Sequence, residues 1–245
     1  MELFDFHCHI DLMPSMINFA RDVAKTNINV LTVTTTPKAF EKEIEILKQF
    51  SNIKVGLGLH PQLVSSRYRE LSLVKELITG ADYIGEIGLD FNRQFYFSKE
   101  KQIEVFENII KWCSEIGGKV ISIHSVRSDK TVLDILEKYK CIEKNKCILH
   151  WFSGTQIQLR RALQMGCFFS VNGAMMESLN GQKLIKLISP NRLLLETDAP
   201  FVNEVQTVPL LKGELEKIVT YLSLTYGEDI IDAIQGTSKS LLSIF

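Results

Sequence analysis

The feature of this sequence that most restricts its fold is a repeated series of short apolar runs, each ending at a polar residue. The runs span Leu3–Ile10, Ile28–Thr34, Ile53–Leu59, Tyr83–Gly88, Val120–His124, Cys147–Trp151, Cys167–Val171 and Arg192–Thr197. The polar residues at their ends are His9, Thr35, His60, Glu86, His124, His150, Asn172 and Asp198, spaced by 26, 25, 26, 38, 26, 22 and 26 positions. Such regular spacing predicts eight parallel βα units, which close into a (β/α)8 TIM barrel.

Helices are predicted between most of the runs, because apolar residues there recur at intervals of three and four. They span Lys38–Phe50, Leu71–Ile78, Lys99–Ile116, Lys130–Tyr139 and Gln156–Met165, with a short helix before Pro190 and a further helix over Leu210–Leu224. A doubly wound open sheet is the alternative, but neither a Gly-x-Gly-x-x-Gly loop nor a Walker loop follows the first run. A chain of 245 residues is accounted for by one such barrel, so we expect a single domain over residues 1–245.

The composition excludes several classes of protein. The 28 Lys and Arg residues nearly balance the 29 Asp and Glu residues, so the net charge of -1 gives no overall attraction to nucleic acid or to anionic membranes. The acidic start, with Glu2 and Asp5, is unlike a secretory signal, and no apolar run is long enough to cross a bilayer. We therefore expect no membrane partner and a cytoplasmic location.

The cysteines support the same location. Their number, five, is odd, and they are scattered mostly within apolar runs, as buried free thiols of a reducing compartment are. A zinc site built from Cys141, Cys147 and His150 is an alternative, but six residues from one thiol to the next matches no common zinc spacing.

All five histidines of the chain fall at or next to the ends of the apolar runs, where a barrel collects its active-site groups. His7 and His9 alternate along one strand and therefore share a face. Glu86 lies in an apolar run between Gly85 and Gly88, and a buried carboxylate requires a cation or a proton. The alternatives are a buried ion pair for Glu86 and hydrogen-bonded core positions for the histidines.

A pair of divalent ions accounts for this set of side chains. Four imidazoles and two carboxylates are more ligands than one tetrahedral ion needs. In the predicted arrangement His7, His9 and Asp198 hold one ion, His124 and His150 hold the other, and Glu86 lies between them. Imidazole and carboxylate ligands leave Mg, Mn and Zn open as the metal. Paired ions polarise a phosphoryl or carbonyl oxygen and activate water, so the predicted chemistry is hydrolysis.

Six motifs along the chain resemble those of TatD-type metal-dependent deoxyribonucleases, a family of the amidohydrolase superfamily. In order they are Phe6-His7-Cys8-His9, Gly58-Leu59-His60-Pro61, Ile84-Gly85-Glu86-Ile87-Gly88-Leu89-Asp90, Ile123-His124-Ser125, His150-Trp151-Phe152-Ser153-Gly154 and Leu195-Glu196-Thr197-Asp198-Ala199-Pro200. The resemblance implies an amidohydrolase-like barrel and a divalent-metal phosphodiesterase that degrades DNA, commonly single strands from the 3′ end. It also implies that His7, His9, Glu86, His124, His150 and Asp198 are metal ligands and that His60 lies near the scissile phosphate.

The chain departs from the family pattern in two places. The segment after Asp198 is short, and Val126 follows His124-Ser125 where the family has Arg, with Arg127 one position later. With these departures the chain resembles the TatD-like subunit of the Qat anti-phage defence system. That resemblance would imply other protein subunits as partners.

The expected mechanism is attack on phosphorus by metal-activated water. Asp198 takes the proton of that water, and the ions with His60 stabilise the developing charge. Glu86, which lies between the ions, is the third candidate catalytic residue. Arg93 and Arg127 are candidate contacts for other phosphates of the strand, and Trp151 is a candidate for base stacking. The alternatives are that the two arginines are solvated surface charges and that Trp151 is a packing residue.

Two other functions fit the same residues: a small-molecule amidohydrolase, lactonase or esterase, and an accessory subunit of a larger complex.

Overall fold

The strands of the structure, a computed structural model that describes residues 1–242, follow one another in a single sheet in the order β1 to β8. They are β1 Leu3–Cys8, β2 Ile28–Val33, β3 Ile53–Leu57, β4 Tyr83–Asp90, β5 Val120–Val126, β6 Lys146–His150, β7 Phe168–Val171 and β8 Leu193–Leu195. This sequential order with helical connections is that of a (β/α)8 barrel, so the predicted fold class is confirmed.

The helices occupy the connections and the carboxyl-terminal part of the chain. They are α1 Met16–Val23, α2 Pro37–Leu47, α3 Val64–Arg67, α4 Leu71–Leu77, α5 Lys99–Ile116, α6 Asp129–Lys138, α7 Cys141–Lys144, α8 Gln156–Met165, α9 Gly173–Glu177, α10 Leu179–Ile185, α11 Val208–Tyr226 and α12 Ile230–Leu242. The predicted bounds of α5 and α8 are confirmed, whereas α1 and α12 were not predicted. Both carry buried apolar residues, but Pro14 before α1 and Gly236 within α12 weaken the helical pattern in the sequence.

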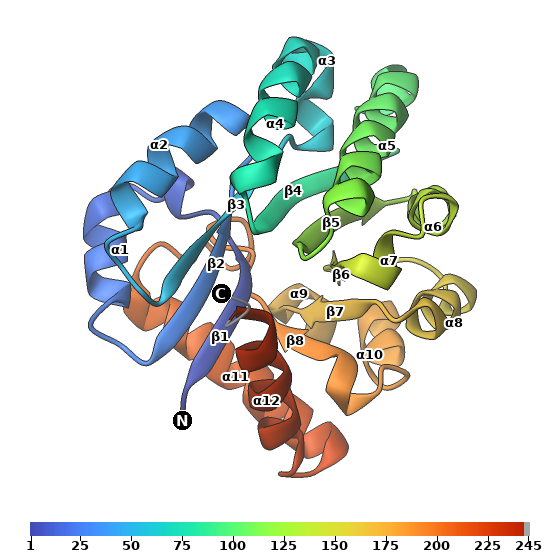
Figure 1. Cartoon of the computed structure of the whole chain (residues 1–245). Helices are drawn as coiled ribbons and strands as arrows, with labels where there is room; N and C mark the ends of the chain where they lie inside the picture. The colour runs from blue at the N-terminus through green and yellow to red at the C-terminus, as the bar shows by residue number, and fades with distance from the viewer. Residues whose placement is uncertain (243–245) are drawn as a thin grey trace. The chain divides into compact units, whose positions relative to one another are not determined.

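Two compact units make up the described chain. One contains residues 1–32, 43–55 and 169 onward, and the other contains residues 33–42 and 56–168. In the first unit, α11 and α12 pack beside β1 and β8, and in the second, α5 and α6 pack beside β4 and β5 (Figure 1). The expectation of a single domain stays a prediction.

In the first unit the end of β1 joins the segment that follows β8. The backbone N–H of Asp198 donates to the carbonyl of His7 at 2.8 Å, and that of His9 donates to the carbonyl of Ala199 at 2.8 Å. Strand β8 is shorter than predicted and ends at Leu195, so Asp198 lies on the loop that these bonds fix to β1.

In the second unit β4 is longer than predicted, extending to Asp90, and is irregular at its centre. Its pairing with β5 shifts between Ile84 and Ile87, as at a β-bulge, which is a place where strands re-aim side chains. Gly88, at φ +143°, lies so close to β5 that a Cβ atom would come within 2.1 Å of the His124 carbonyl oxygen. Glycine inside a strand often marks such a close approach of another backbone, and Gly88 is a case of it.

Candidate metal centres

His7, His9 and Asp198, here called the His9 cluster, lie together in the first unit. Their potential ligand atoms are all within 4.8 Å of one another. Oδ1 of Asp198 lies 3.5 Å from Nε2 of His9 and 3.8 Å from Nε2 of His7. All three side chains are buried. Two imidazoles and a carboxylate that converge in a buried place are a donor set that suits a divalent ion.

Asp5 holds the backbone on both sides of the His9 cluster. Its carboxylate accepts hydrogen bonds from the backbone N–H of His7 at 3.2 Å, the backbone N–H of Thr197 at 3.0 Å and the Thr197 hydroxyl at 2.6 Å. Burial raises the pKa of Asp5 to about 7, although these bonds act in the opposite direction. No role for Asp5 was predicted. The sequence did carry a signal for it, because Asp5 is a carboxylate inside the apolar run Leu3–Ile10, just as Glu86 is a carboxylate inside an apolar run.

Asp198 has a left-handed backbone conformation, with φ +50°. Arg127 and Trp151, which directly follow strands β5 and β6, have φ +52° and +38°. Residues other than glycine rarely adopt such angles, and where they do the residue is often functional. All three are predicted site residues; Arg127 and Trp151 directly follow a strand, whereas Asp198 lies on the loop after β8.

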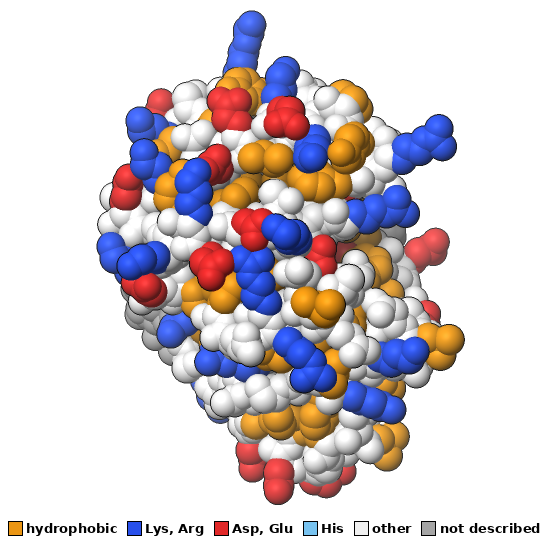
Figure 2. Space-filling view, turned by 90° about the vertical axis from the view of Figure 1, so that its right-hand side faces the viewer, with side chains coloured by type: hydrophobic (Ala, Val, Ile, Leu, Met, Phe, Trp, Pro, Cys, Tyr) orange, Lys and Arg blue, Asp and Glu red, His pale blue; other side chains and the backbone are white. Residues whose placement is uncertain are grey.

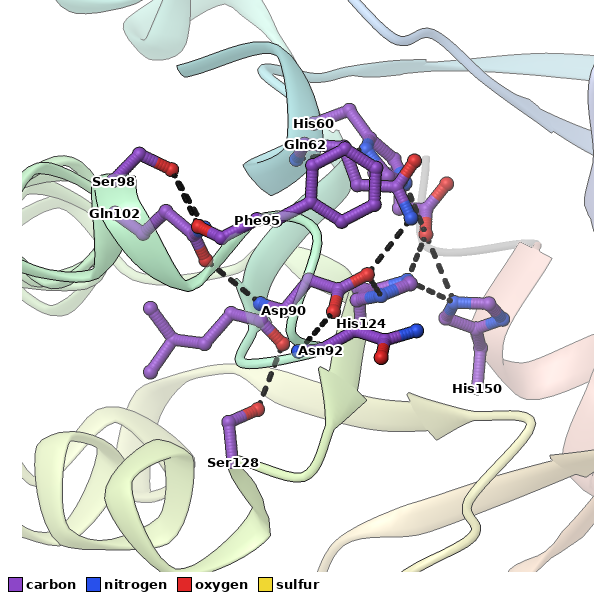
Figure 3. A network of polar contacts seen from close by, with 12 residues as sticks. His60, Gln62, Asp90, Asn92, Phe95, Ser98, Gln102, His124, Ser128 and His150 are labelled. Carbon is purple, nitrogen blue, oxygen red and sulfur yellow. Dashed lines mark hydrogen bonds and ion pairs between the residues drawn. The ribbon is translucent and has the colours of Figure 1, made fainter. Parts of the chain in front are cut away.

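Glu86 collects imidazoles around one carboxylate oxygen in the second unit. Its Oε1 lies 2.7 Å from Nδ1 of His124, 2.9 Å from Nε2 of His150 and 3.2 Å from Nε2 of His60 (Figure 3). We call these four residues the Glu86 cluster. Glu86 is 2% exposed, so its carboxylate needs a positive partner, and a divalent ion among these donors would provide one.

Asp90, which lies four residues after Glu86 on β4, fixes the other side of the His124 ring. Its Oδ2 lies 3.2 Å from Nε2 of His124 and accepts a hydrogen bond from the Gln62 side chain at 2.7 Å, while Oδ1 accepts one from the backbone N–H of Asn92 at 2.8 Å (Figure 3).

These contacts shift the pKa values of both Asp90 and His124. Burial raises the pKa of Asp90, but its hydrogen bonds outweigh the effect of burial and the pKa is lowered. Burial lowers the pKa of His124, but bonds with Asp90 and Glu86 outweigh it and the pKa is raised. A carboxylate on the second nitrogen of a metal-ligating histidine orients the ring.

Glu196 lies next to the predicted strand end at Asn172. Its carboxylate accepts hydrogen bonds from the Ser170 hydroxyl and, at 2.8 Å, from the Asn172 side chain. The two donors are uncharged side chains, one from β7 and one from the residue that follows it.

The predicted substrate contacts all belong to the second unit. Arg93 and Arg127 are exposed, and Trp151 is 37% exposed. Phe152, by contrast, is buried and serves packing. On the face drawn in Figure 2, Lys and Arg side chains are interspersed with Asp and Glu, so this face offers a polyanion no continuous basic patch.

The cysteines do not take part in these clusters. All five are free and buried, as predicted, and Sγ of Cys141 lies 3.9 Å from Sγ of Cys147. Within residues 1–242 no group of potential metal ligands contains a cysteine. In the same residues, no helix combines the length and apolar character needed to span a membrane.

Glu43 is a buried carboxyl group of the first unit that was not predicted. It is 1% exposed, its Oε2 lies 3.4 Å from the Thr32 hydroxyl, and its Oε1 has no hydrogen-bond partner among the described residues. Burial, followed by the charge of Asp11, raises the pKa of Glu43 to about 8, against the opposite effect of His9.

Replacing Glu43 by Gln is expected to stabilise the metal-free protein at high pH. Because the pKa is about 8 in the folded chain and near 4.5 when unfolded, wild type loses stability as the pH rises from 4.5 to 8, and the loss is complete above 8. The free energy of unfolding of the variant, minus that of wild type, should therefore be roughly 3–5 kcal/mol larger at pH 9 than at pH 4. Chemical denaturation at pH 4, 7 and 9 in chelator tests this, with exposed Glu45→Gln on the same helix as control. A difference independent of pH would contradict it.

Comparisons with known proteins place this chain among similar sequences and folds. A family model described as TatD related DNase matches residues 4–245. An uncharacterized metal-dependent hydrolase of Buchnera aphidicola is 30% identical over 227 residues, covering 83% of this chain and 83% of that protein. Human deoxyribonuclease TATDN3 is 24% identical over 266 aligned positions, covering 99% and 94%. The 3'-5' ssDNA/RNA exonuclease TatD of Erwinia amylovora is 28% identical over 200 residues, covering 77% and 76%.

A solved structure has the same fold. The TatD homologue YJJV of Escherichia coli K12 superposes with a TM-score of 0.82 at 20% sequence identity, covering 98% of this chain and 97% of that one. The likeness supports the barrel assignment independently of strand order.

Proposed function

Since the chain belongs to the family of TatD related DNases, we propose that it hydrolyses DNA phosphodiester bonds with the help of divalent metal ions, acting on single strands or 3′ ends. The observation that carries the proposal is the convergence of His60, His124 and His150 on one buried oxygen of Glu86. The name of the Erwinia amylovora relative supports the single-strand preference.

The metal requirement is proposed as two ions, of Mg, Mn or Zn. His7, His9 and Asp198 would hold one, and Glu86, His124 and His150 would hold the other. When bound, divalent ions lower the pKa of water and stabilise charge on phosphoryl oxygens. The earlier expectation that Glu86 bridges both ions stays a prediction.

The side chains of the clusters have separate proposed tasks. Asp198 takes the proton of the attacking water at its carboxylate, since general bases act through a positioned oxygen of this kind. His60 stabilises charge that develops on the phosphate. Arg93, Arg127 and Trp151 would contact the rest of the strand, as exposed basic and aromatic side chains do in single-strand binders.

A nuclease assay tests the proposal. Purified protein is incubated with 3′- and 5′-labelled single-stranded DNA in Mg, Mn or chelator, and its metal content is measured. We expect metal-dependent loss of label and two ions per chain. Cleavage that is unchanged in chelator would contradict the metal requirement. Metal binding without cleavage of any nucleic acid would favour the small-molecule hydrolase or the accessory subunit.

The cellular setting is proposed from the sequence. A cytoplasmic location is supported by the buried free thiols. An anti-phage role with partner subunits stays a prediction, which rests on the short segment after Asp198 and on Val126 at the position where the family has Arg.

A further inference from the structure

The connection between β4 and α5, residues 91–98, holds two aromatic side chains in solvent. Tyr96 is 52% exposed and Phe97 is 77% exposed. Both belong to the 3-10 helix η5, Tyr96–Ser98, which leads directly into α5. Aromatic rings gain free energy when a flat apolar partner covers them, so two neighbouring exposed rings are a candidate contact for a ligand.

Buried hydrogen bonds fix this loop to the Glu86 cluster. The Gln102 side chain, which is 0% exposed, accepts a hydrogen bond from the backbone N–H of Asp90 at 2.8 Å. The same side chain donates to the Phe95 carbonyl at 3.1 Å and to the Ser98 hydroxyl at 3.0 Å (Figure 3). Asp90 also contacts a histidine ring of the cluster. The loop is therefore ordered beside the candidate metal centre, and such preorganisation lowers the entropic cost of binding a ligand.

Lys99 adds a positive charge beside the two rings. Its Nζ lies 5.2 Å from the centroid of the Phe91 ring and 5.3 Å from that of the Tyr96 ring, and it donates a hydrogen bond to the Tyr96 hydroxyl at 3.4 Å. These aromatic faces attract the ammonium group and restrict its position. The charged side chains of residues 91–99 are Arg93 and Lys99, both positive, so the loop itself is complementary to an anion.

An exposed ring with a cation beside it suits an unpaired nucleotide. Each base of a single strand offers an aromatic face for stacking, and each nucleotide adds a negative phosphate for the cation. In a duplex the faces of the bases are covered by their neighbours. A protein partner could also cover the rings, but an apolar protein surface would leave the two positive charges without a complement.

We propose that the β4–α5 loop is a nucleotide subsite, in which Phe97 stacks on an unpaired base and Lys99 contacts a phosphate of the same strand. Tyr96 holds Lys99 in place, and Gln102 is the positioning residue that fixes the loop beside the metal centre. The inference rests on the proposed function, because the strand that reaches this loop is the one whose phosphodiester is cleaved. It makes this loop a source of the preference for single strands.

The base contact is tested with two substitutions and two strands. Phe97→Leu keeps an apolar side chain but removes the ring, whereas Phe97→Trp keeps a ring. The strands are a short thymidine oligonucleotide and one of the same length without bases. For Phe97→Leu we expect KM to rise about 5- to 100-fold with the thymidine strand, the range for loss of one stacked base, and kcat to change little. KM for the strand without bases should stay unchanged.

Two controls accompany the base contact. Phe97→Trp should restore a KM close to that of wild type, because indole stacks on bases as phenyl does. Ile157→Ala removes an equally exposed apolar side chain of the same unit and should leave KM unchanged for both strands.

The phosphate contact is tested with Lys99→Gln. We expect KM to rise for both strands alike, because they carry the same phosphates. The slope of log KM against log salt concentration should fall by about 0.7, the value for one phosphate of a single strand. Lys111→Gln, an exposed substitution farther along α5, is the control and should leave the slope unchanged.

Two results would overturn the subsite. One is a Phe97→Leu protein whose KM is unchanged for the thymidine strand, or is raised equally for both strands. The other is a Phe97→Leu protein whose mass in solution, measured by light scattering, differs from that of wild type, since the ring would then belong to an interface between copies of the chain.

Binding separates the subsite from the proposed function. If wild type cleaves neither strand, the proposed function fails, and fluorescence anisotropy of labelled strands with metal-loaded protein decides the subsite. Tighter binding of the thymidine strand than of the strand without bases, lost in Phe97→Leu, would support the subsite. Equal binding of the two strands, or no binding of either, would overturn it.

Discussion

Glu86→Gln is expected to remove metal from the Glu86 cluster and to lower DNA cleavage by at least about 1,000-fold, since the bound ion supplies several kcal/mol of transition-state stabilisation. The carboxylate oxygen that lies between 2.7 and 3.2 Å from three imidazoles would become a neutral amide group. An amide binds divalent transition metals weakly compared with a carboxylate, and it compensates no positive charge. Gln has the same shape as Glu, so the fold of β4 should persist.

The measurements for Glu86→Gln are metal content, cleavage rate and thermal unfolding. Glu100→Gln, an exposed substitution in α5, is the control and should match wild type in all three. A Glu86→Gln protein that is folded, contains the full metal complement and cleaves DNA normally would show that the cluster is a structural network of buried polar groups. A folded variant without metal that keeps the biological role would favour an accessory subunit.

Asp198→Asn is expected to lower kcat by about 100- to 10,000-fold, the range for loss of a general base. The carboxylate oxygen 3.5 Å from His9 and 3.8 Å from His7 would be replaced by an amide, so binding of an ion at the His9 cluster should weaken as well. Asn tolerates the left-handed conformation at φ +50° better than most residues, which keeps the loop in place.

The comparison that isolates the charge of Asp198 uses two further variants. Asp229→Asn changes an exposed carboxylate in the same unit and should leave kcat unchanged. Asp198→Ala removes the carboxylate and strains the backbone, so it should add a loss of stability of about 1–2 kcal/mol to the loss of activity. Asp198→Asn protein with wild-type kcat in Mg and Mn would exclude Asp198 as the base.

Fold class was predictable because it depends on a repeat that extends along the chain. A buried strand needs an apolar run, a helix needs apolar positions at intervals of three and four, and their alternation leaves few topologies.

The residues at which strands end were harder to predict. The run that ends in Asp198 was expected to be strand to Thr197, yet β8 ends at Leu195. Hydrogen bonds from Thr197 to Asp5 compete there with the strand ladder, and a partner 192 positions away leaves no local signal.

The candidate ligands were predictable for a different reason. A histidine or carboxylate in or just after an apolar run conflicts with its surroundings, and that conflict is visible without a structure. The residues that orient the ligands give no such signal. Gln62 follows a proline in an ordinary turn, and only folding brings its side chain to Asp90, 28 positions away. Glu43 belongs to an amphipathic helix whose sequence does not show that this position faces the interior.

The sequence by itself determined which kinds of side chain meet at the strand ends, because residue type and strand periodicity are local properties. Tertiary structure alone decided which atom of each side chain is used. Nδ1 of His124 faces Glu86 and its Nε2 faces Asp90, whereas His60 presents Nε2 to Glu86 and Nδ1 to the backbone. The two nitrogens of a ring are equivalent in the sequence, and they become distinct only when hydrogen-bond partners from other strands and loops approach them.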